Sequence, residues 1–470
     1  MKKTIILYNP KAVFFDMPLA LIALGTQVCE DYNVVIIDAR IESDVDEILK
    51  EYIDQALLVG VTSLTGAPLK DAISFSKKVK DLRPELTVLW GGWHTSLFPK
   101  QILEEIKEVD ITVQGQGEVA FKELVQHIEN KNELEGITGI VFRKDGELVS
   151  TKPRPMMDIN DLPRFNYDLI DVEKYFTAKG NRQFDFISSI GCFFRCTFCA
   201  DPFVFGRKFS GLSPERIFED LKYFHEKYQF DDLNFQDETF FTYPKKIVEL
   251  ANLLKQNGRK FSWAATMRAD HGNRMSLEDF QTCKDGGLRR LLIGVESGSQ
   301  EMMDWLKKDI KIEHVLKCAQ RCKELDLAVI FPFIVGFPNE TDESVEKSKG
   351  MIQQLSLMSP RFETPVFYFK PYPGTQITND VVKSGEYKLP NSLEDWSEFD
   401  YIGSKGPWVS DEKFVFFERF KFYLRLARKR NNLLILPFSM LARWRVKKLL
   451  FKTPIEMKIS EKILPQKNLS

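Results

Sequence analysis

The stretch that decides the fold reads Ser188-Ser189-Ile190-Gly191-Cys192-Phe193-Phe194-Arg195-Cys196-Thr197-Phe198-Cys199-Ala200-Asp201-Pro202. It sets three cysteines, Cys192, Cys196 and Cys199, in one loop directly after an apolar run, 184–190, that is typical of a strand. Three thiolates can hold a four-iron cluster, but such a cluster usually takes four cysteines, so one iron keeps an open coordination position. The loop therefore predicts an iron–sulfur cluster with one ligand that is not a protein side chain.

A zinc site is the alternative interpretation of this loop. Structural zinc takes four Cys or His ligands, but the loop has no His, and no second cysteine pair follows at zinc-finger spacing. The remaining cysteines are interpreted as small apolar residues of the core: Cys29, Cys283, Cys318 and Cys322. The loop alone favours the cluster and leaves zinc as the weaker alternative.

The composition is that of an ordinary globular protein. The chain has 470 residues, a formal net charge of −1 and seven cysteines, which fits two or three domains with substantial cores. No run of about twenty apolar residues occurs, so no membrane span is expected. The first apolar run, Thr4–Tyr8, is too short for a signal peptide, and clustered thiols fit a reducing compartment, so we expect a cytoplasmic protein.

The first 130 residues or so predict an α/β fold with a doubly wound, flavodoxin-like parallel sheet, because short β-branched runs alternate with helical patterns. The expected strands are Thr4–Tyr8, Asn33–Asp38, Leu57–Thr62, Thr87–Trp90 and Ile111–Gln114. Ligands of such sheets bind beyond the carboxyl ends of the strands. Glycines and hydroxyls in those loops give the candidate contacts Ser63, Thr65, Gly91 and Gly92, although each loop taken singly is also explained as an ordinary turn.

The middle of the chain predicts a second α/β domain. An Asp-Gly turn at 145–146 predicts a hairpin of 137–143 with 147–151, and a proline-containing linker follows to about residue 180. Six longer strand–helix units then fit a partial (β/α)6 barrel, with strands at Phe184–Ile190, Asp232–Gln236, Lys260–Thr266, Leu291–Glu296, Ala328–Val335 and Thr364–Phe369. The expected segments are 1–135, 136–180, 181–410 and 411–470.

Charged residues follow three of the predicted barrel strands. Asp237 and Glu238 come after the second strand, where carboxylates suit an ammonium group of a ligand. Arg268 follows the third strand as a fixed cation, and Glu296 ends the fourth. A solvated acidic turn is the alternative interpretation of the carboxylate pair.

The last 58 residues, 413–470, carry fifteen Lys and Arg against three Glu. Apolar residues recur at helical spacing in two stretches, 414–424 and 433–441, which predicts a basic helical region. A helical cap on the more acidic barrel is the favoured interpretation, and a basic amphipathic helix lying on anionic lipid is the alternative. Nucleic acid is not expected as a partner, because no recognisable binding motif accompanies the charge.

The cysteine loop resembles the signature of the radical S-adenosylmethionine (SAM) enzymes, Cys-x3-Cys-x2-Cys with an aromatic residue before the last cysteine, which here is Phe198. In that superfamily the open iron chelates SAM, and one electron cleaves SAM to methionine and a 5′-deoxyadenosyl radical. The Ser-x-Thr and Gly-Gly-x-His-x-Ser loops of the first domain resemble the cobalamin-binding domain of the cobalamin-dependent members. The resemblance spans about residues 4 to 400.

The resemblance implies the cofactor contacts. Cys192, Cys196 and Cys199 would hold a 4Fe–4S cluster, with Phe198 beside it. The remaining implied contacts are Asp237, Glu238 and Arg268 for the methionine half of SAM, Glu296 for the ribose, and Ser63, Thr65, Gly91 and Gly92 for cobalamin. No residue is assigned to catalysis. His94 is not assigned as a cobalt ligand, because the Asp-x-His-x-x-Gly motif of His-ligating cobalamin proteins is absent.

The implied activity is methylation of an unactivated carbon, in which one SAM methylates cob(I)alamin and a second supplies the radical. Relatives cyclise, rearrange or dehydrate with the same cofactors, and these outcomes stay open, as does a domain that has lost cobalamin. A cobalamin carrier or sensor is the non-enzymatic alternative. The implied partners are a small-molecule or lipid-like substrate and a flavodoxin or ferredoxin electron donor, and peripheral membrane contact through the C-terminal region stays open.

Overall fold

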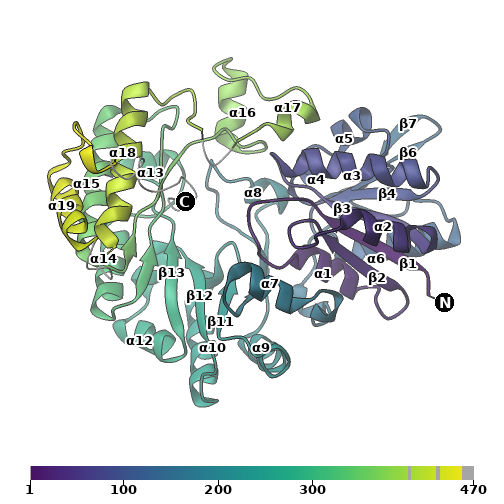
Figure 1. Cartoon of the computed structure of the whole chain (residues 1–470), viewed down its shortest axis with the longest axis horizontal. Coiled ribbons are helices and arrows are strands. Elements are labelled where there is room, and N and C mark those ends of the chain that lie inside the picture. Colours follow the sequence, from purple (N-terminus) through teal and green to yellow (C-terminus); the bar gives the residue numbers. More distant parts are fainter. Residues whose placement is uncertain (1, 401–403, 430–434, 458–470) are drawn as a thin grey trace. The chain divides into compact units, whose positions relative to one another are not determined.

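The structure is a computed structural model that describes residues 2–400, 404–429 and 435–457. It contains two compact units (Figure 1). The first unit comprises Met1–Glu238 and Tyr372–Tyr401, and the second comprises Thr239–Pro371 and Ile402–Ser470. The segment boundaries expected from the sequence, at 135, 180 and 410, follow motifs rather than these units and stay predictions.

The first unit is built on a seven-stranded sheet of order β2-β1-β3-β4-β5-β6-β7. Its strands are β1 Thr4–Asn9, β2 Asn33–Asp38, β3 Ala56–Thr62, β4 Thr87–Gly91, β5 Ile111–Val113, β6 Ile140–Lys144 and β7 Glu147–Ser150. The first five strands pair in parallel, and β6 and β7 are added antiparallel as the expected hairpin. The doubly wound fold class is therefore confirmed.

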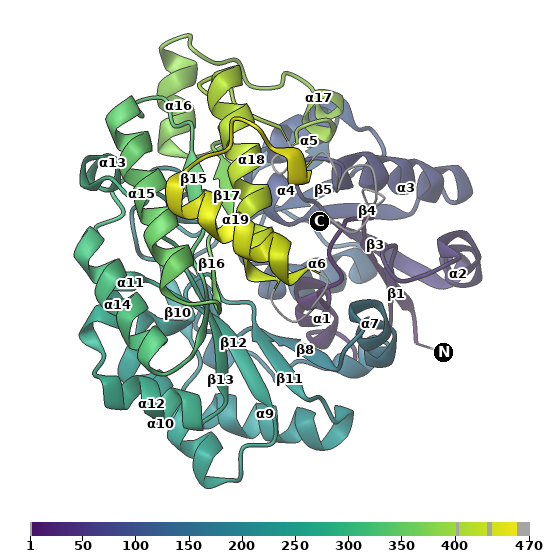
Figure 2. The same ribbon diagram turned by 60° about the vertical axis from the view of Figure 1, so that its left-hand side comes forward.

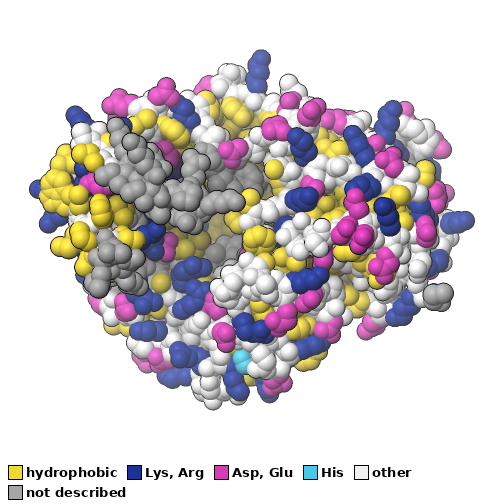
Figure 3. Space-filling model, in the orientation of Figure 1, with side chains coloured by type: hydrophobic (Ala, Val, Ile, Leu, Met, Phe, Trp, Pro, Cys, Tyr) yellow, Lys and Arg dark blue, Asp and Glu magenta, His cyan; other side chains and the backbone are white. Residues whose placement is uncertain are grey.

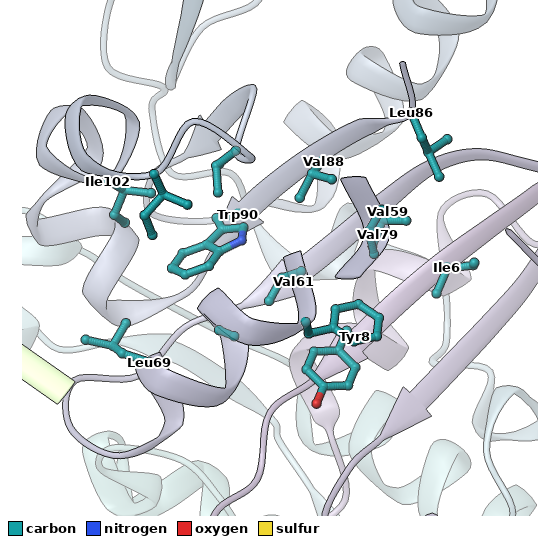
Figure 4. Packing of buried hydrophobic residues seen from close by; sticks show 14 of the residues in the cluster. Ile6, Tyr8, Val59, Val61, Leu69, Val79, Leu86, Val88, Trp90 and Ile102 are labelled. Atoms are coloured by element: carbon teal, nitrogen blue, oxygen red, sulfur yellow. The ribbon is translucent and has the colours of Figure 1, made fainter. Parts of the chain in front are cut away.

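Helices cover both faces of this sheet. They are α1 Leu19–Thr26, α2 Val45–Tyr52, α3 Pro68–Leu82, α4 Trp93–Leu97, α5 Pro99–Glu105 and α6 Glu118–Asn130. Because successive strand residues face opposite sides, alternate residues of β1 enter two separate cores. Ile6 and Tyr8 pack with α2, α3 and α5, whereas Ile5 and Leu7 pack with α1 and α6. Figure 4 shows the first core around Trp90, whose indole N–H donates to Ser76 Oγ at 2.9 Å.

The first unit also contains the start of the barrel segment. Its elements are α7 Val172–Lys179, β8 Gln183–Phe186, β9 Ser189–Gly191, α8 Asp201–Val204, β10 Phe209–Gly211, α9 Pro214–Tyr228, β11 Asp232–Phe235, α16 Gln376–Lys383 and α17 Leu393–Ser397. The single strand expected at 184–190 is wrong, because it is two strands. β8 pairs in parallel with β11, and β9 pairs antiparallel with β10. At Ser188, between β8 and β9, the chain leaves the pairing with β11 and enters the pairing with β10. The backbone N–H of Ser188 donates to the Asp237 carboxylate at 3.2 Å.

The second unit carries the later barrel strands. Its strands are β12 Ser262–Met267, β13 Leu288–Ile293, β14 Ala328–Ile330, β15 Phe333–Val335, β16 Phe362–Glu363 and β17 Val366–Tyr368. All of the pairings of these strands with one another are parallel, in agreement with the predicted parallel barrel sheet. Its helices are α10 Pro244–Gln256, α11 Ala269–Arg274, α12 Leu277–Asp285, α13 Gln300–Trp305, α14 Ile312–Glu324, α15 Asp342–Met358, α18 Asp411–Arg428 and α19 Leu436–Lys448.

Two of the strands expected in this unit differ from the structure at a proline. The expected strand Ala328–Val335 breaks at Pro332 into β14 and β15, and the expected strand Thr364–Phe369 starts only after Pro365, as β17. Proline has no N–H to donate to a neighbouring strand, so it ends each ladder. The carbonyl of Pro332 instead accepts from the backbone N–H of Glu296 at 3.1 Å, which fixes that residue at the end of its strand segment.

The C-terminal region is helical, as expected, and α18 packs beside α19 (Figure 2). α18 buries Phe417, Phe420 and Tyr423, and its Arg428 pairs with Glu363 of β16 at 2.5 Å. The expected apolar stretch 433–441 begins at residues that lie outside the described ones, and its described part belongs to α19. No helix among the described residues is both long enough and apolar enough to cross a membrane.

Candidate active site

The cysteine loop is closed by a short antiparallel ladder. Gly191, directly before Cys192, pairs with Phe209 of β10, so the whole loop 192–208 is held at its two ends. Gly191 has a φ of +77°, and a Cβ there would overlap the carbonyl oxygen of Lys208. Only glycine fits this position, because a side chain would be strained by the backbone and by the neighbouring strand.

The three thiols lie near one another in this loop. The backbone N–H of Cys199 donates to the carbonyl of Cys196 at 3.3 Å, which folds the loop back on itself. Burial raises the pKa of the Cys199 thiol to about 12, and the charges of Asp201, Cys196 and Cys192 add to the shift. Three thiolates so placed need a strong positive charge among them, as iron supplies. No group of three His, Cys, Asp or Glu side chains in the described ranges is arranged around a single ion.

Two carboxyl groups lie beside the cysteines: Asp201 is buried, whereas Glu238 is exposed. Both oxygens of Asp201 are buried and have no hydrogen-bond partner among the described residues. Burial raises the pKa of Asp201 to about 7, and partial loss of water together with the charge of Asp201 raises the pKa of Glu238 to about 8. One buried and one accessible carboxyl group fit a positively charged ligand such as the ammonium or sulfonium group of SAM. Glu238 was predicted from the sequence, whereas Asp201 was not assigned, because only the fold reveals its burial.

Asp237 serves the backbone of the same region. Its carboxylate accepts from the Ser188 hydroxyl at 2.7 Å and from the Ser189 hydroxyl. Burial raises its pKa to about 6, although these hydrogen bonds oppose the shift. Asp237 thus positions the start of β9, and its direct contact with SAM stays a prediction.

An open cavity of about 240 Å³ lies at the carboxyl ends of β3, β4 and β5. Ligands of doubly wound sheets bind at this place in the fold. Gly91 and Gly92 line it, as predicted, and Ile190 and Glu238 of the barrel segment line it as well. The cavity therefore has walls from both the sheet domain and the segment that carries the cysteine loop.

The two glycines play different parts. Gly92 has a φ of +97°, and a Cβ there would lie 2.8 Å from the carbonyl oxygen of Ser63. A Cβ on Gly91 would meet only the carbonyl oxygen of Val113, at 3.9 Å. Gly92 is thus required by the loop itself, whereas Gly91 keeps space open in the cavity.

Ser63 and Thr65 face inward in this structure. Ser63 Oγ and Thr95 Oγ1 are 2.6 Å apart, and Thr65 Oγ1 is 3.0 Å from His94 Nδ1. Burial lowers the pKa of His94 to about 3, so its ring is neutral. None of these four residues is among the described residues that line the cavity. These four residues support the glycine loop without lining the cavity. Direct contacts of Ser63 and Thr65 with cobalamin stay predictions.

Gln116, which lies in a loop after the fifth predicted strand but was not assigned as a contact, supplies a polar group at the cavity. Its Oε1 accepts from the backbone N–H of Met157 at 2.9 Å, while its Nε2 is buried without a hydrogen-bond partner among the described residues. Such an amide donor fits a ligand that carries carbonyl groups, as the amide side chains of cobalamin do. The glycine cradle and this unpaired amide therefore fit cobalamin. The signal in the sequence was the run Gly115-Gln116-Gly117-Glu118 after β5.

The other two predicted contacts, Arg268 and Glu296, belong to the second unit. Arg268 follows β12 and is only 8% exposed, and its guanidinium donates to Asp270 at 3.0 Å and to the carbonyl of Lys308 at 2.6 Å. Glu296 has a φ of +64° and forms a buried ion pair with Lys308. Both side chains are held by fixed partners at strand ends, and their contacts with SAM stay predictions.

Two family descriptions match the chain. The B12 binding domain matches residues 4–125, and the Radical SAM superfamily matches residues 186–352. The first covers the cavity loops and the second covers the cysteine loop. The two matched regions therefore meet at the site described above.

The chain is similar to an uncharacterized methyltransferase of Pyrococcus horikoshii, with 31% identity over 381 residues, 80% of this chain and 79% of the relative. It is 22% identical over 331 residues to the anaerobic magnesium-protoporphyrin IX monomethyl ester cyclase of Synechocystis, covering 69% of this chain and 66% of the relative. Among solved structures, the cobalamin-dependent SAM radical enzyme OxsB shares the fold at 16% identity, with a TM-score of 0.76 over 98% of this chain and 75% of that chain.

These similarities show that the chain belongs to the radical SAM enzymes that carry a B12-binding domain. Membership of the superfamily implies a 4Fe–4S cluster and SAM, and the B12-binding domain implies cobalamin. Cys192, Cys196 and Cys199 fit the cluster because one loop, closed at its base, carries all three thiols. The glycine-lined cavity fits cobalamin because it lies beyond the strand ends, is open and presents an unpaired amide.

Replacing Cys196 with Ser should remove most of the iron that the protein holds after anaerobic reconstitution, because two thiolates do not retain the cluster. Iron and acid-labile sulfide per chain measure the effect. Cys29→Ser is the matched control, because Cys29 makes only local contacts with Thr26 and Asn166 that a hydroxyl can replace. Equal iron in the two variants would contradict the assignment.

Replacing Gly91 with Val should lower the affinity for cobalamin by about 5- to 150-fold, because overpacking a fitted site costs about 1–3 kcal/mol. The fold should persist, since an added Cβ meets only one protein atom. Cobalamin binding is measured by absorbance titration. The matched control is Gly136→Val, at a position where a Cβ would meet nothing within 4 Å. Unchanged affinity in the Gly91 variant would place cobalamin elsewhere.

Proposed function

We propose that this radical SAM enzyme is a cobalamin-dependent methyltransferase that acts on an unactivated carbon. The observation that supports this most is the shared cavity wall within the first unit. Gly91 comes from the B12-binding domain, whereas Ile190 and Glu238 flank the cysteine loop and β11 of the barrel segment. A substrate held in this cavity would face both cofactor sites at once, as methyl transfer to a substrate radical requires.

The relatives support methylation over other outcomes. The relative with 31% identity over 80% of this chain is named as a methyltransferase, whereas the cyclase relative is 22% identical over 69%. Cyclisation stays the second candidate function, because that cyclase matches 69% of this chain. An electron donor such as flavodoxin or ferredoxin is part of the proposal, since reductive cleavage of SAM requires one electron.

When bound, the cluster, SAM and cobalamin supply the radical and the methyl group, and the protein contributes orientation, charge and exclusion of water. Asp201, which is buried, and Glu238, which is exposed and lines the cavity, place two carboxyl groups where a cationic ligand would lie. A bound cation would favour the ionised form of both groups. The cavity is lined mainly by apolar side chains, among them Leu24, Phe121 and Phe165. Such a lining keeps water from quenching a reactive carbon centre.

Incubation of the reconstituted enzyme with cell extract and SAM that carries a trideuteromethyl group should yield a metabolite with that group attached to carbon. S-adenosylhomocysteine and 5′-deoxyadenosine should form together, because two SAM molecules have different fates. Mass spectrometry detects all three products. The Cys196→Ser variant is the negative control for products that other enzymes in the extract form. Release of 5′-deoxyadenosine without S-adenosylhomocysteine, with cobalamin bound, would favour cyclisation or rearrangement.

A further inference from the structure

α19 packs on the second unit through its small and polar side. Ser439, Ala442 and Val446 are buried, and they recur at the spacing of one helix face. Ser439 Oγ donates to the carbonyl of Ala427 in α18 at 3.0 Å, and Gln353 of α15 donates to the carbonyl of Val446 at 2.8 Å. The inner face of α19 is therefore fixed by contacts that need little apolar area.

The opposite face of α19 is apolar and points outward. Four large apolar side chains on it are strongly exposed: Phe438 at 45%, Met440 at 67%, Leu441 at 40% and Trp444 at 50%. Leu450 and Ile455, beyond the helix, are exposed as well. Figure 3 shows hydrophobic side chains gathered over the α19 region at the left edge of the view. In the usual amphipathic helix the apolar side faces the core, whereas in α19 the apolar side faces outward.

The border of this apolar face is positively charged. Lys447 and Lys448 follow Trp444 on the exposed side of the helix, and Lys452 is exposed just beyond it. The single acidic residue between 435 and 457, Glu456, is buried and pairs with Arg445 at 2.9 Å. Over these described residues the exposed surface therefore offers basic and apolar groups and no acidic side chain.

We propose that the outward face of α19, formed by Phe438, Met440, Leu441, Trp444, Lys447 and Lys448, binds the surface of an anionic lipid bilayer. Apolar and Trp side chains would enter the boundary between headgroups and acyl chains, while the lysines reach the negative headgroups. The helix has 13 residues and is about 20 Å long, so it lies in the interface and does not span it. This surface is independent of the proposed reaction, because it is formed by α19 alone.

Lipid suits this face better than a second copy of the chain or a polyanion. A second copy would offer Lys447 and Lys448 no acidic partner through the same face, because no acidic side chain is exposed between residues 435 and 457. A nucleic acid would meet the lysines and leave most of the apolar side chains in water. An anionic bilayer satisfies the apolar face and the basic border together.

The test is flotation of the full-length reconstituted protein with vesicles of phosphatidylcholine, with and without about a quarter phosphatidylglycerol. The protein should float with anionic vesicles and not with neutral ones, and binding should weaken as salt rises because surface charges are screened. Trp444→Glu should reduce binding at least tenfold. Val382→Glu is the matched control, because Val382 is an exposed apolar residue of α16, 37% exposed, and lies outside this face.

A second, conservative variant separates loss of lipid contact from loss of folding. Trp444→Phe should still bind anionic vesicles, but it should lose part of the fluorescence quenching that brominated acyl chains cause in the unchanged protein. Vesicle binding that Trp444→Glu leaves unaffected, or equal quenching in the Phe variant, would overturn the proposal. Absence of vesicle binding would also overturn the proposal. The same holds if the face instead forms a dimer that Trp444→Glu disrupts, or if it binds an oligonucleotide.

Discussion

The site depends on the pairing of β9 with β10, which closes the cysteine loop at its base. Gly191 is the constraint in this pairing, since its left-handed backbone and its contact with Lys208 exclude any side chain. Asp237 supports the other end of β9 by accepting from Ser188 and Ser189. The loop that β9 and β10 close carries all three cysteines, and the buried Asp201 lies two residues after the last of them.

This arrangement ties the cysteine loop to the cavity. β9 carries Ile190 into the wall of the cavity and the cysteines into the loop beyond it, so the position of the loop depends on the position of the cavity. Glu238, which follows β11, lines the same wall, and loss of water together with the charge of Asp201 raises its pKa to about 8. Carboxyl groups with raised pKa values are common at functional sites.

Most of the fold, and the family that implies the cluster, could be predicted from the sequence because their signals are local. The cysteine spacing, the Gly-Gly loop and the alternation of strands and helices need no knowledge of distant contacts. The inward direction of Ser63 and Thr65 could not be predicted, because it depends on packing against Thr95 and His94. The breaks at Pro332 and Pro365 had a sequence signal, but the surrounding apolar residues hid it. Burial of Asp201 and the outward apolar face of α19 are decided only by tertiary packing.

The central claim is that three cysteines hold a cluster whose remaining iron is open to SAM. Electron–nuclear double resonance of the reduced, reconstituted protein tests it most directly, with SAM that carries nitrogen-15 at its amino group and oxygen-17 at its carboxylate. The account predicts magnetic coupling of both labels to the cluster and a changed spectrum of the cluster itself. A spectrum that is identical with and without SAM, and shows no coupling to either label, would contradict it.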